Sequence, residues 1–196
     1  RELLQSVVGT DQLLVQAPTD SEEEGFDRLS DHDAIRQRLL SIVRTKMNNV
    51  TAQEISGTGA SPCYITADTI VVAEDPAAGI MVLGQPGPQD WQSDVRDWML
   101  RLYSGRSHEV WTGFRIDCGE RSHEQIVSST VHFSQLTESL VERYLATEES
   151  VGKAGGYAIQ GAAAAFVDGI EGSLSNIIGL PVMELIQAME QLKIVP

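Results

Sequence analysis

The stretch Tyr64-Ile65-Thr66-Ala67-Asp68-Thr69-Ile70-Val71-Val72 decides the fold that we expect for this chain. Its β-branched and apolar residues are typical of a buried β-strand. Asp68 stands in the middle of the run, and a buried carboxylate is costly unless a metal ion, a cation or several hydrogen-bond donors meet it. Asp68 therefore either caps a turn at the end of the strand or works in a cleft, and this stretch alone leaves both interpretations open.

Helical and strand patterns flank this strand on both sides, which predicts an α/β fold. Further strands are expected over residues 80–83, 107–117 and 124–133, with a short one over 13–15. Helices are expected over residues 2–8, 30–47, 91–102 and 136–148, and from Pro181 onward. Residues 167–172 are expected to form a turn. The 196 residues contain no internal repeat or low-complexity linker, so we expect a single domain over residues 1–196.

Lys46 lies on the apolar stripe of the helix that opens at Ser30, a stripe formed by Ile35, Leu39, Ile42, Val43 and Met47. Either its alkyl chain packs while the amine reaches solvent, or its ammonium group points into a cleft to meet a phosphate. The acidic segment from Pro18 to Gly25 leaves a similar choice. Its composition is typical of a solvated loop, but carboxylates held near Asp68 would form a divalent-metal site.

The chain is strongly acidic, with a net charge of −14. This charge argues against the broad basic footprint of nucleic-acid-binding proteins. A small phosphate ligand is still compatible with it, because a metal ion can supply positive charge. The two cysteines, Cys63 and Cys118, are too few for a disulfide framework or a zinc site and fit a reducing compartment. No apolar run approaches the length of a membrane span, so we expect no membrane partner.

Several strings occur in an order and at a spacing that resemble the Maf family of nucleoside triphosphate pyrophosphatases. They are Ala67-Asp68-Thr69-Ile70-Val71, Leu83-Gly84-Gln85-Pro86, Leu102-Tyr103-Ser104-Gly105-Arg106-Ser107-His108, Gly155-Gly156-Tyr157-Ala158-Ile159-Gln160-Gly161 and Gly179-Leu180-Pro181. The resemblance covers nearly the whole chain. It implies an elongated α/β fold similar to inosine triphosphate pyrophosphatase, with a strongly twisted mixed sheet and a cleft between two lobes.

The same resemblance implies an activity and a set of site residues. Members of the family cleave a nucleoside triphosphate to the monophosphate and pyrophosphate, and they require Mg²⁺ or Mn²⁺. Asp68 matches the catalytic aspartate, Lys46 the helix lysine, and Glu22 the glutamate of the acidic loop, with Asp68 and Glu22 as the implied metal ligands. Thr69 and Gln160 match positions that select the base. Their combination resembles the branch that acts on dTTP and UTP, with modified pyrimidine nucleotides as further candidates.

Two departures from the family pattern bear on activity. The family carries a strand and a Ser-x-Ser-Pro-Arg-Arg loop directly before Arg1-Glu2-Leu3-Leu4, and this loop, which contacts the triphosphate, is absent from the sequence. Gln85 replaces a lysine that lies near the phosphates in the family. The resemblance therefore predicts either a fragment of an active enzyme or a weakened member. The alternative function is a nucleotide-binding protein with a regulatory role in cell division.

The resemblance also implies partners, and the cysteine content implies a location. The expected small-molecule partner is a nucleoside triphosphate, and a homodimer is a candidate assembly because dimers are common in the family. A cytoplasmic location is expected.

Overall fold

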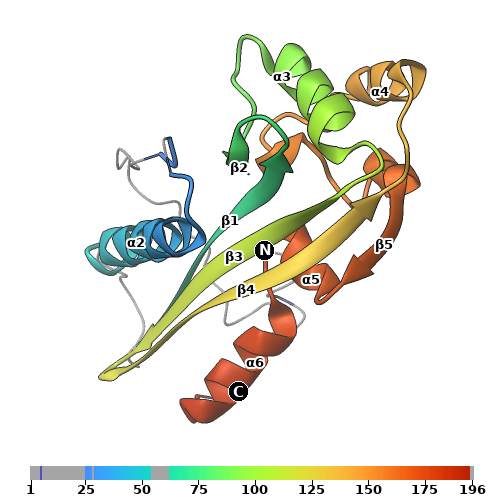
Figure 1. The fold of residues 1–196 in the computed structure, drawn as a ribbon. Helices are drawn as coiled ribbons and strands as arrows, with labels where there is room; N and C mark the ends of the chain where they lie inside the picture. The colour runs from blue at the N-terminus through green and yellow to red at the C-terminus, as the bar shows by residue number, and fades with distance from the viewer. Residues whose placement is uncertain (1–4, 6–24, 28, 54–61, 195–196) are drawn as a thin grey trace.

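The structure is a computed structural model that describes residues 5, 25–27, 29–53 and 62–194. Within these residues, a single twisted sheet has the strand order β2-β1-β3-β4-β5, and all four neighbouring pairs are antiparallel (Figure 1). The strands are β1 (Cys63–Asp75), β2 (Gly79–Leu83), β3 (Ser107–Cys118), β4 (Arg121–Phe133) and β5 (Val167–Glu171). The predicted α/β class is confirmed, whereas the parallel pairing of a mixed sheet does not occur among the described strands.

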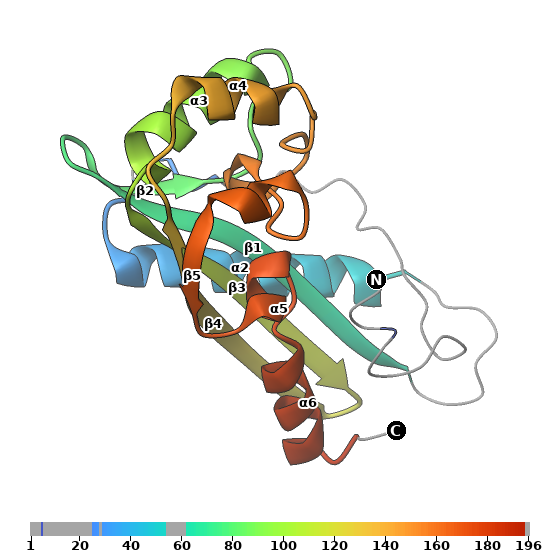
Figure 2. The same ribbon diagram turned by 90° about the vertical axis from the view of Figure 1, so that its right-hand side faces the viewer.

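Helices cover both faces of this sheet. They are α2 (His32–Thr51), α3 (Trp91–Asp97), the π-helix η1 (Trp98–Tyr103), α4 (Glu138–Leu145), the 3₁₀ turns η2 (Ala154–Gly156) and η3 (Ala162–Phe166), α5 (Leu174–Ile178) and α6 (Val182–Gln191). Helix α2 lies along one face, and α5 and α6 lie along the other, while α3 and α4 pack together at the β2 end (Figures 1 and 2). None of the described helices combines the length and the apolar character that crossing a bilayer requires.

Helix α2 forms where its apolar spacing predicts. The five predicted stripe residues are the buried ones in this helix, namely Ile35, Leu39, Ile42, Val43 and Met47. The capping residue is Asp31, whose carboxylate accepts a hydrogen bond of 2.9 Å from the backbone N–H of Ala34. Helix α2 is thereby anchored at its start and held against the sheet by its buried stripe.

The alternation of side chains along β1 and β3 separates the core into parts on opposite faces of the sheet. Ile70, Val72 and Trp111 pack with Ile35 and Leu39 of α2 on one face. The other face carries two clusters, one beneath α3, η1 and α4 and one beneath α6. The pocket described below is lined mainly by residues of the first of these clusters, including Val71, Val110 and Tyr157.

Two expectations from the sequence are wrong. Residues 167–172 are not a turn, because Val167–Glu171 forms β5 and pairs with β4 at the edge of the sheet. An edge strand that is mostly exposed lacks the apolar alternation by which strands are recognised. The two cysteines, which the sequence led us to expect unpaired, face each other across β1 and β3 and form a disulfide between Cys63 and Cys118.

Candidate active site

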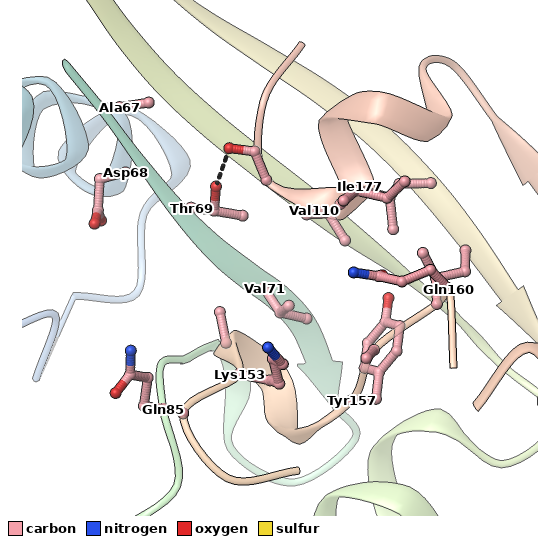
Figure 3. Close-up of a pocket in the computed structure, with 16 residues that line it drawn as sticks. Ala67, Asp68, Thr69, Val71, Gln85, Val110, Lys153, Tyr157, Gln160 and Ile177 are labelled. Atoms are coloured by element: carbon pink, nitrogen blue, oxygen red, sulfur yellow. Dashed lines mark hydrogen bonds between the residues drawn. The ribbon is translucent and has the colours of Figure 1, made fainter. Parts of the chain in front are cut away.

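A pocket of about 330 Å³ opens beside the middle of β1 and is lined by Asp68 and Thr69, among others. These two neighbours point to opposite sides of the strand (Figure 3). Among the described strands, β2 pairs only with residues 71–75 of β1, and none of them pairs with β1 on that side next to Asp68. The pocket therefore receives side chains from both faces of the sheet.

Lys46 and Asp68 form an ion pair at the edge of this pocket. Nζ of Lys46 lies 2.5 Å from Oδ1 of Asp68, and the two side chains are 19% and 20% exposed. Lys46 thus directs its ammonium group to the carboxylate of Asp68, which lines the pocket, although Lys46 is not itself one of the lining residues. A partly buried ion pair of this kind keeps a carboxylate and a cation next to the space that a ligand can fill.

Gln85 and Lys153 line the same pocket, opposite β1 (Figure 3). Gln85 follows β2, and Lys153 precedes the 3₁₀ turn η2. The two segments are joined by a hydrogen bond of 2.9 Å from the N–H of Gly155 to the carbonyl oxygen of Gly84. These two side chains give one end of the pocket a polar group and a cation of the kind that bind a phosphate chain.

Gly155 explains why a glycine-rich string is needed at this place. Its φ is +67°, a conformation that other residues rarely adopt, and an added Cβ would lie 2.6 Å from Cγ2 of Val71. Its carbonyl oxygen accepts a hydrogen bond of 3.0 Å from the hydroxyl of Tyr103. The close approach to β1 and to Tyr103 fixes the segment that carries Lys153.

The other end of the pocket is more apolar. Val110, Ile177 and Tyr157 lie there, and the amide of Gln160 extends toward them (Figure 3). Oη of Tyr157 lies 2.8 Å from Nε2 of the buried His108. Burial raises the pKa of the Tyr157 hydroxyl. Burial is also the larger of the two causes that lower the pKa of His108 to about 3. Both side chains are therefore neutral at physiological pH. A flat apolar wall with one amide suits a nucleobase better than a phosphate chain.

The structure brings together most of the residues that the sequence singled out. Asp68, Thr69, Gln85 and Gln160 line one pocket, and Lys46 contacts Asp68 at its edge. Glu22 lies outside the described residues. Lys153 was not singled out as a site residue, although it stands inside the glycine-rich string, where a lone cation among glycines signals a ligand contact.

A divalent ion fits this site in a limited way. Within the described residues, no group of three or more His, Cys, Asp or Glu side chains is arranged to hold a metal ion. Mg²⁺ often takes only one or two carboxylates from the protein and completes its shell with water and substrate phosphates. Asp68, which lines the pocket, is a suitable carboxylate for that mode of binding.

Comparison with known proteins gives a consistent result. The family model described as Maf-like protein matches residues 1–192. A protein of Pyrococcus furiosus named dTTP/UTP pyrophosphatase is 34% identical over 158 residues, which cover 81% of this chain and 78% of the relative. A protein of the same name from Acinetobacter baylyi is 38% identical over 64% of this chain and 67% of its own length. A third, from Bartonella quintana, is 42% identical over 70% of this chain and 54% of its own length.

Proposed function

This chain belongs to the Maf family, and we propose that it is a nucleoside triphosphate pyrophosphatase that acts on dTTP and UTP. Relatives named for this activity support the proposal. The observation that carries it is the Lys46–Asp68 ion pair, with 2.5 Å between Nζ and Oδ1, at the edge of a pocket of nucleotide size. Modified pyrimidine triphosphates belong to the same proposal, because they present the same phosphate chain.

In this proposal, the phosphate chain lies at the end of the pocket that contains Gln85 and Lys153, and the base lies near Thr69 and Gln160. Lys46 and Lys153 neutralise charge that develops on phosphate oxygens, and the amide of Gln85 donates a hydrogen bond to them. Asp68 orients the attacking water and accepts its proton. Water adds to phosphorus, the anhydride bond between the α- and β-phosphates breaks, and the products are the monophosphate and pyrophosphate.

We propose Asp68 as a protein ligand for Mg²⁺ or Mn²⁺, with Glu22 as a second. A divalent ion held there would supply positive charge that offsets the negative charge of the phosphate chain.

The decisive experiment compares Asp68→Asn with the unchanged protein in a pyrophosphate-release assay. The substrates are dTTP, UTP and a methylated guanosine triphosphate, each with and without Mg²⁺. We expect Asp68→Asn to lower turnover of dTTP by at least about 100-fold, as loss of one charge-stabilising or proton-accepting group does. Asp117→Asn on β3 is the control, because Asp117 pairs with Arg115 and does not line the pocket. Equal turnover by Asp68→Asn and Asp117→Asn would refute the assignment.

Gln85 favours a second candidate, a nucleotide-binding protein without significant turnover. It lines the pocket with a neutral amide where the family resemblance leads us to expect a lysine. In that case the pocket binds the triphosphate without cleaving it. Tight binding of dTTP by calorimetry, with no pyrophosphate released in the same buffer, would establish this function instead.

A further inference from the structure

Thr112 lies on β3 directly across from Thr69, and its side chain is completely buried. The hydroxyl oxygens of the two threonines are 2.9 Å apart. Two backbone carbonyls complete this cluster. The carbonyl oxygen of Asn176 lies 3.3 Å from Oγ1 of Thr112, and that of Gly179 lies 3.4 Å from Oγ1 of Thr69. Figure 3 shows the bond from Thr69, which crosses from β1 to the segment after α5.

Each hydroxyl has one hydrogen to donate, and this limits the possible arrangements. If Thr112 donates to the carbonyl of Asn176, Thr69 must donate in the bond between the two hydroxyls. If Thr112 donates to Thr69 instead, the hydrogen of Thr69 goes to the carbonyl of Gly179. In both arrangements the hydroxyl of Thr69 donates its hydrogen to another oxygen of the protein. Oγ1 of Thr69 then has a lone pair free to accept a hydrogen bond from a ligand in the pocket.

The two carbonyls are held firmly in place. The side-chain amide of Asn176 is buried and donates hydrogen bonds of 3.0 Å to the carbonyl oxygen of Val110 and to Oγ of Ser129. Gly179 ends α5 with a φ of 118°, and its N–H donates a bond of 2.9 Å to the carbonyl oxygen of Asn176. Since α5 is fixed to the sheet in this way, the acceptors that face Thr112 and Thr69 cannot readily turn away.

Gln160 cannot supply the same directionality. Its amide carries both donors and an acceptor, and rotation of the side chain presents either one to a ligand. Gln160 is also exposed, whereas Thr69 is half-buried next to its partners. The fixed polarity in the pocket therefore comes from Thr69.

We propose that Thr112 is a positioning residue that makes Thr69 a hydrogen-bond acceptor toward the pocket, so that the site selects bases with a hydrogen on ring nitrogen N3. The proposal rests on the proposed function, which places the base near Thr69. Uracil and thymine carry a hydrogen on N3, whereas N3 of cytosine is an acceptor. Two acceptors that face each other lose a hydrogen bond and repel, so cytosine nucleotides are rejected.

The test compares Thr112→Val with Thr112→Ser. Valine keeps the shape of threonine but removes the hydroxyl, while serine keeps the hydroxyl. The measured quantity is the ratio of kcat/KM for UTP to that for CTP. We expect the unchanged protein to favour UTP by at least about 100-fold, and Thr112→Val to lower this ratio about tenfold, the effect of about one hydrogen bond. Thr112→Ser should keep the ratio.

A second measurement separates this proposal from the proposed function. The affinities of the non-hydrolysable α,β-methylene analogues of UTP and CTP are measured by calorimetry on the same three proteins. If Thr112 had a merely structural role, Thr112→Val would weaken the binding of both analogues alike. The proposal instead requires the ratio of the two affinities to change in Thr112→Val. An unchanged ratio in Thr112→Val, or an equal change in Thr112→Ser, overturns it. Binding without cleavage by the unchanged protein would refute the proposed function and still test the role of Thr112.

Discussion

Gly113 lies directly across from Asp68 in the register of β3 with β1, on the face that α2 covers. A Cβ atom at Gly113 would lie 3.0 Å from Cγ of Leu39 and 3.2 Å from Cγ2 of Val43. The absence of a side chain there lets α2 pack tightly on the sheet. This close packing brings Lys46, one turn further along the same helix, within reach of Asp68.

Replacement of Gly113 by alanine should push α2 away from β1. We expect a loss of about 1–3 kcal/mol in the free energy of unfolding, as overpacked cores show. Pyrophosphate release should fall together with stability, because the contact between Lys46 and Asp68 lengthens. Gly169→Ala on β5 is the matched control, since an added Cβ there meets its nearest neighbour at an ordinary 3.7 Å. Urea denaturation and the activity assay measure both effects, and a fully active Gly113→Ala would contradict the argument.

Loss of the ammonium group of Lys46 should impair catalysis more than folding. Lys46→Met keeps the alkyl chain but leaves the carboxylate of Asp68 without this cation. We expect turnover of dTTP to fall about 100-fold, the usual cost of one charge-stabilising contact. Arg44→Met is the control. It removes a charge from the same helix, but the ion pair that it breaks is with Glu124, which does not line the pocket. A similar loss of activity in both variants would show that only the charge of α2 matters.

Gln85→Lys should restore a cation near the phosphate chain. Because the pocket already contains Lys153, we expect a gain of about tenfold in kcat/KM for dTTP, with most of the change in KM. The gain should shrink as salt is raised from low to physiological concentration. Gln92→Lys is the control, because it adds the same charge on the exposed side of α3 and should leave KM unchanged. If Gln85→Lys leaves KM unchanged, Gln85 does not face the phosphates.

His108 should make stability depend on pH in a defined window. Burial is the larger cause that lowers its pKa from 6.5 to about 3, and the charge of His132 is the smaller. As pH falls below 6.5, the unfolded chain binds a proton at this residue before the folded protein does. The contribution of neutral His108 to the free energy of unfolding is therefore fully present above pH 6.5. As pH falls toward 3, the free energy of unfolding decreases by about 1.4 kcal/mol per pH unit.

Urea denaturation of the protein and of His108→Gln between pH 7 and pH 4 measures this contribution. The difference in the free energy of unfolding between the unchanged protein and His108→Gln should narrow or reverse as pH falls. The reason is that the unchanged protein loses the contribution of neutral His108, whereas glutamine does not titrate. His123→Gln serves as control, since His123 lies on the β4 surface and contacts Gln125. A constant difference across the window would mean that His108 does not titrate as its burial requires.

The sequence by itself determined most of the local elements and the residue types that line the pocket. The apolar run around Asp68 predicted β1, and the spacing of Ile35, Leu39 and Met47 predicted the face of α2 that is buried. Such patterns are local, since they depend on a strand period of two and a helical period of 3.6 residues. The family resemblance then pointed to Asp68, Lys46, Thr69, Gln85 and Gln160, which the structure places in or beside one pocket.

Only the tertiary structure decided which partners these residues meet. The stripe position of Lys46 left its partner undetermined, and the way α2 packs on β1 brings its ammonium group to Asp68. The pairings of Cys63 with Cys118 and of Thr69 with Thr112 join residues more than forty positions apart. Strand register creates these contacts, and no local period in the sequence encodes it.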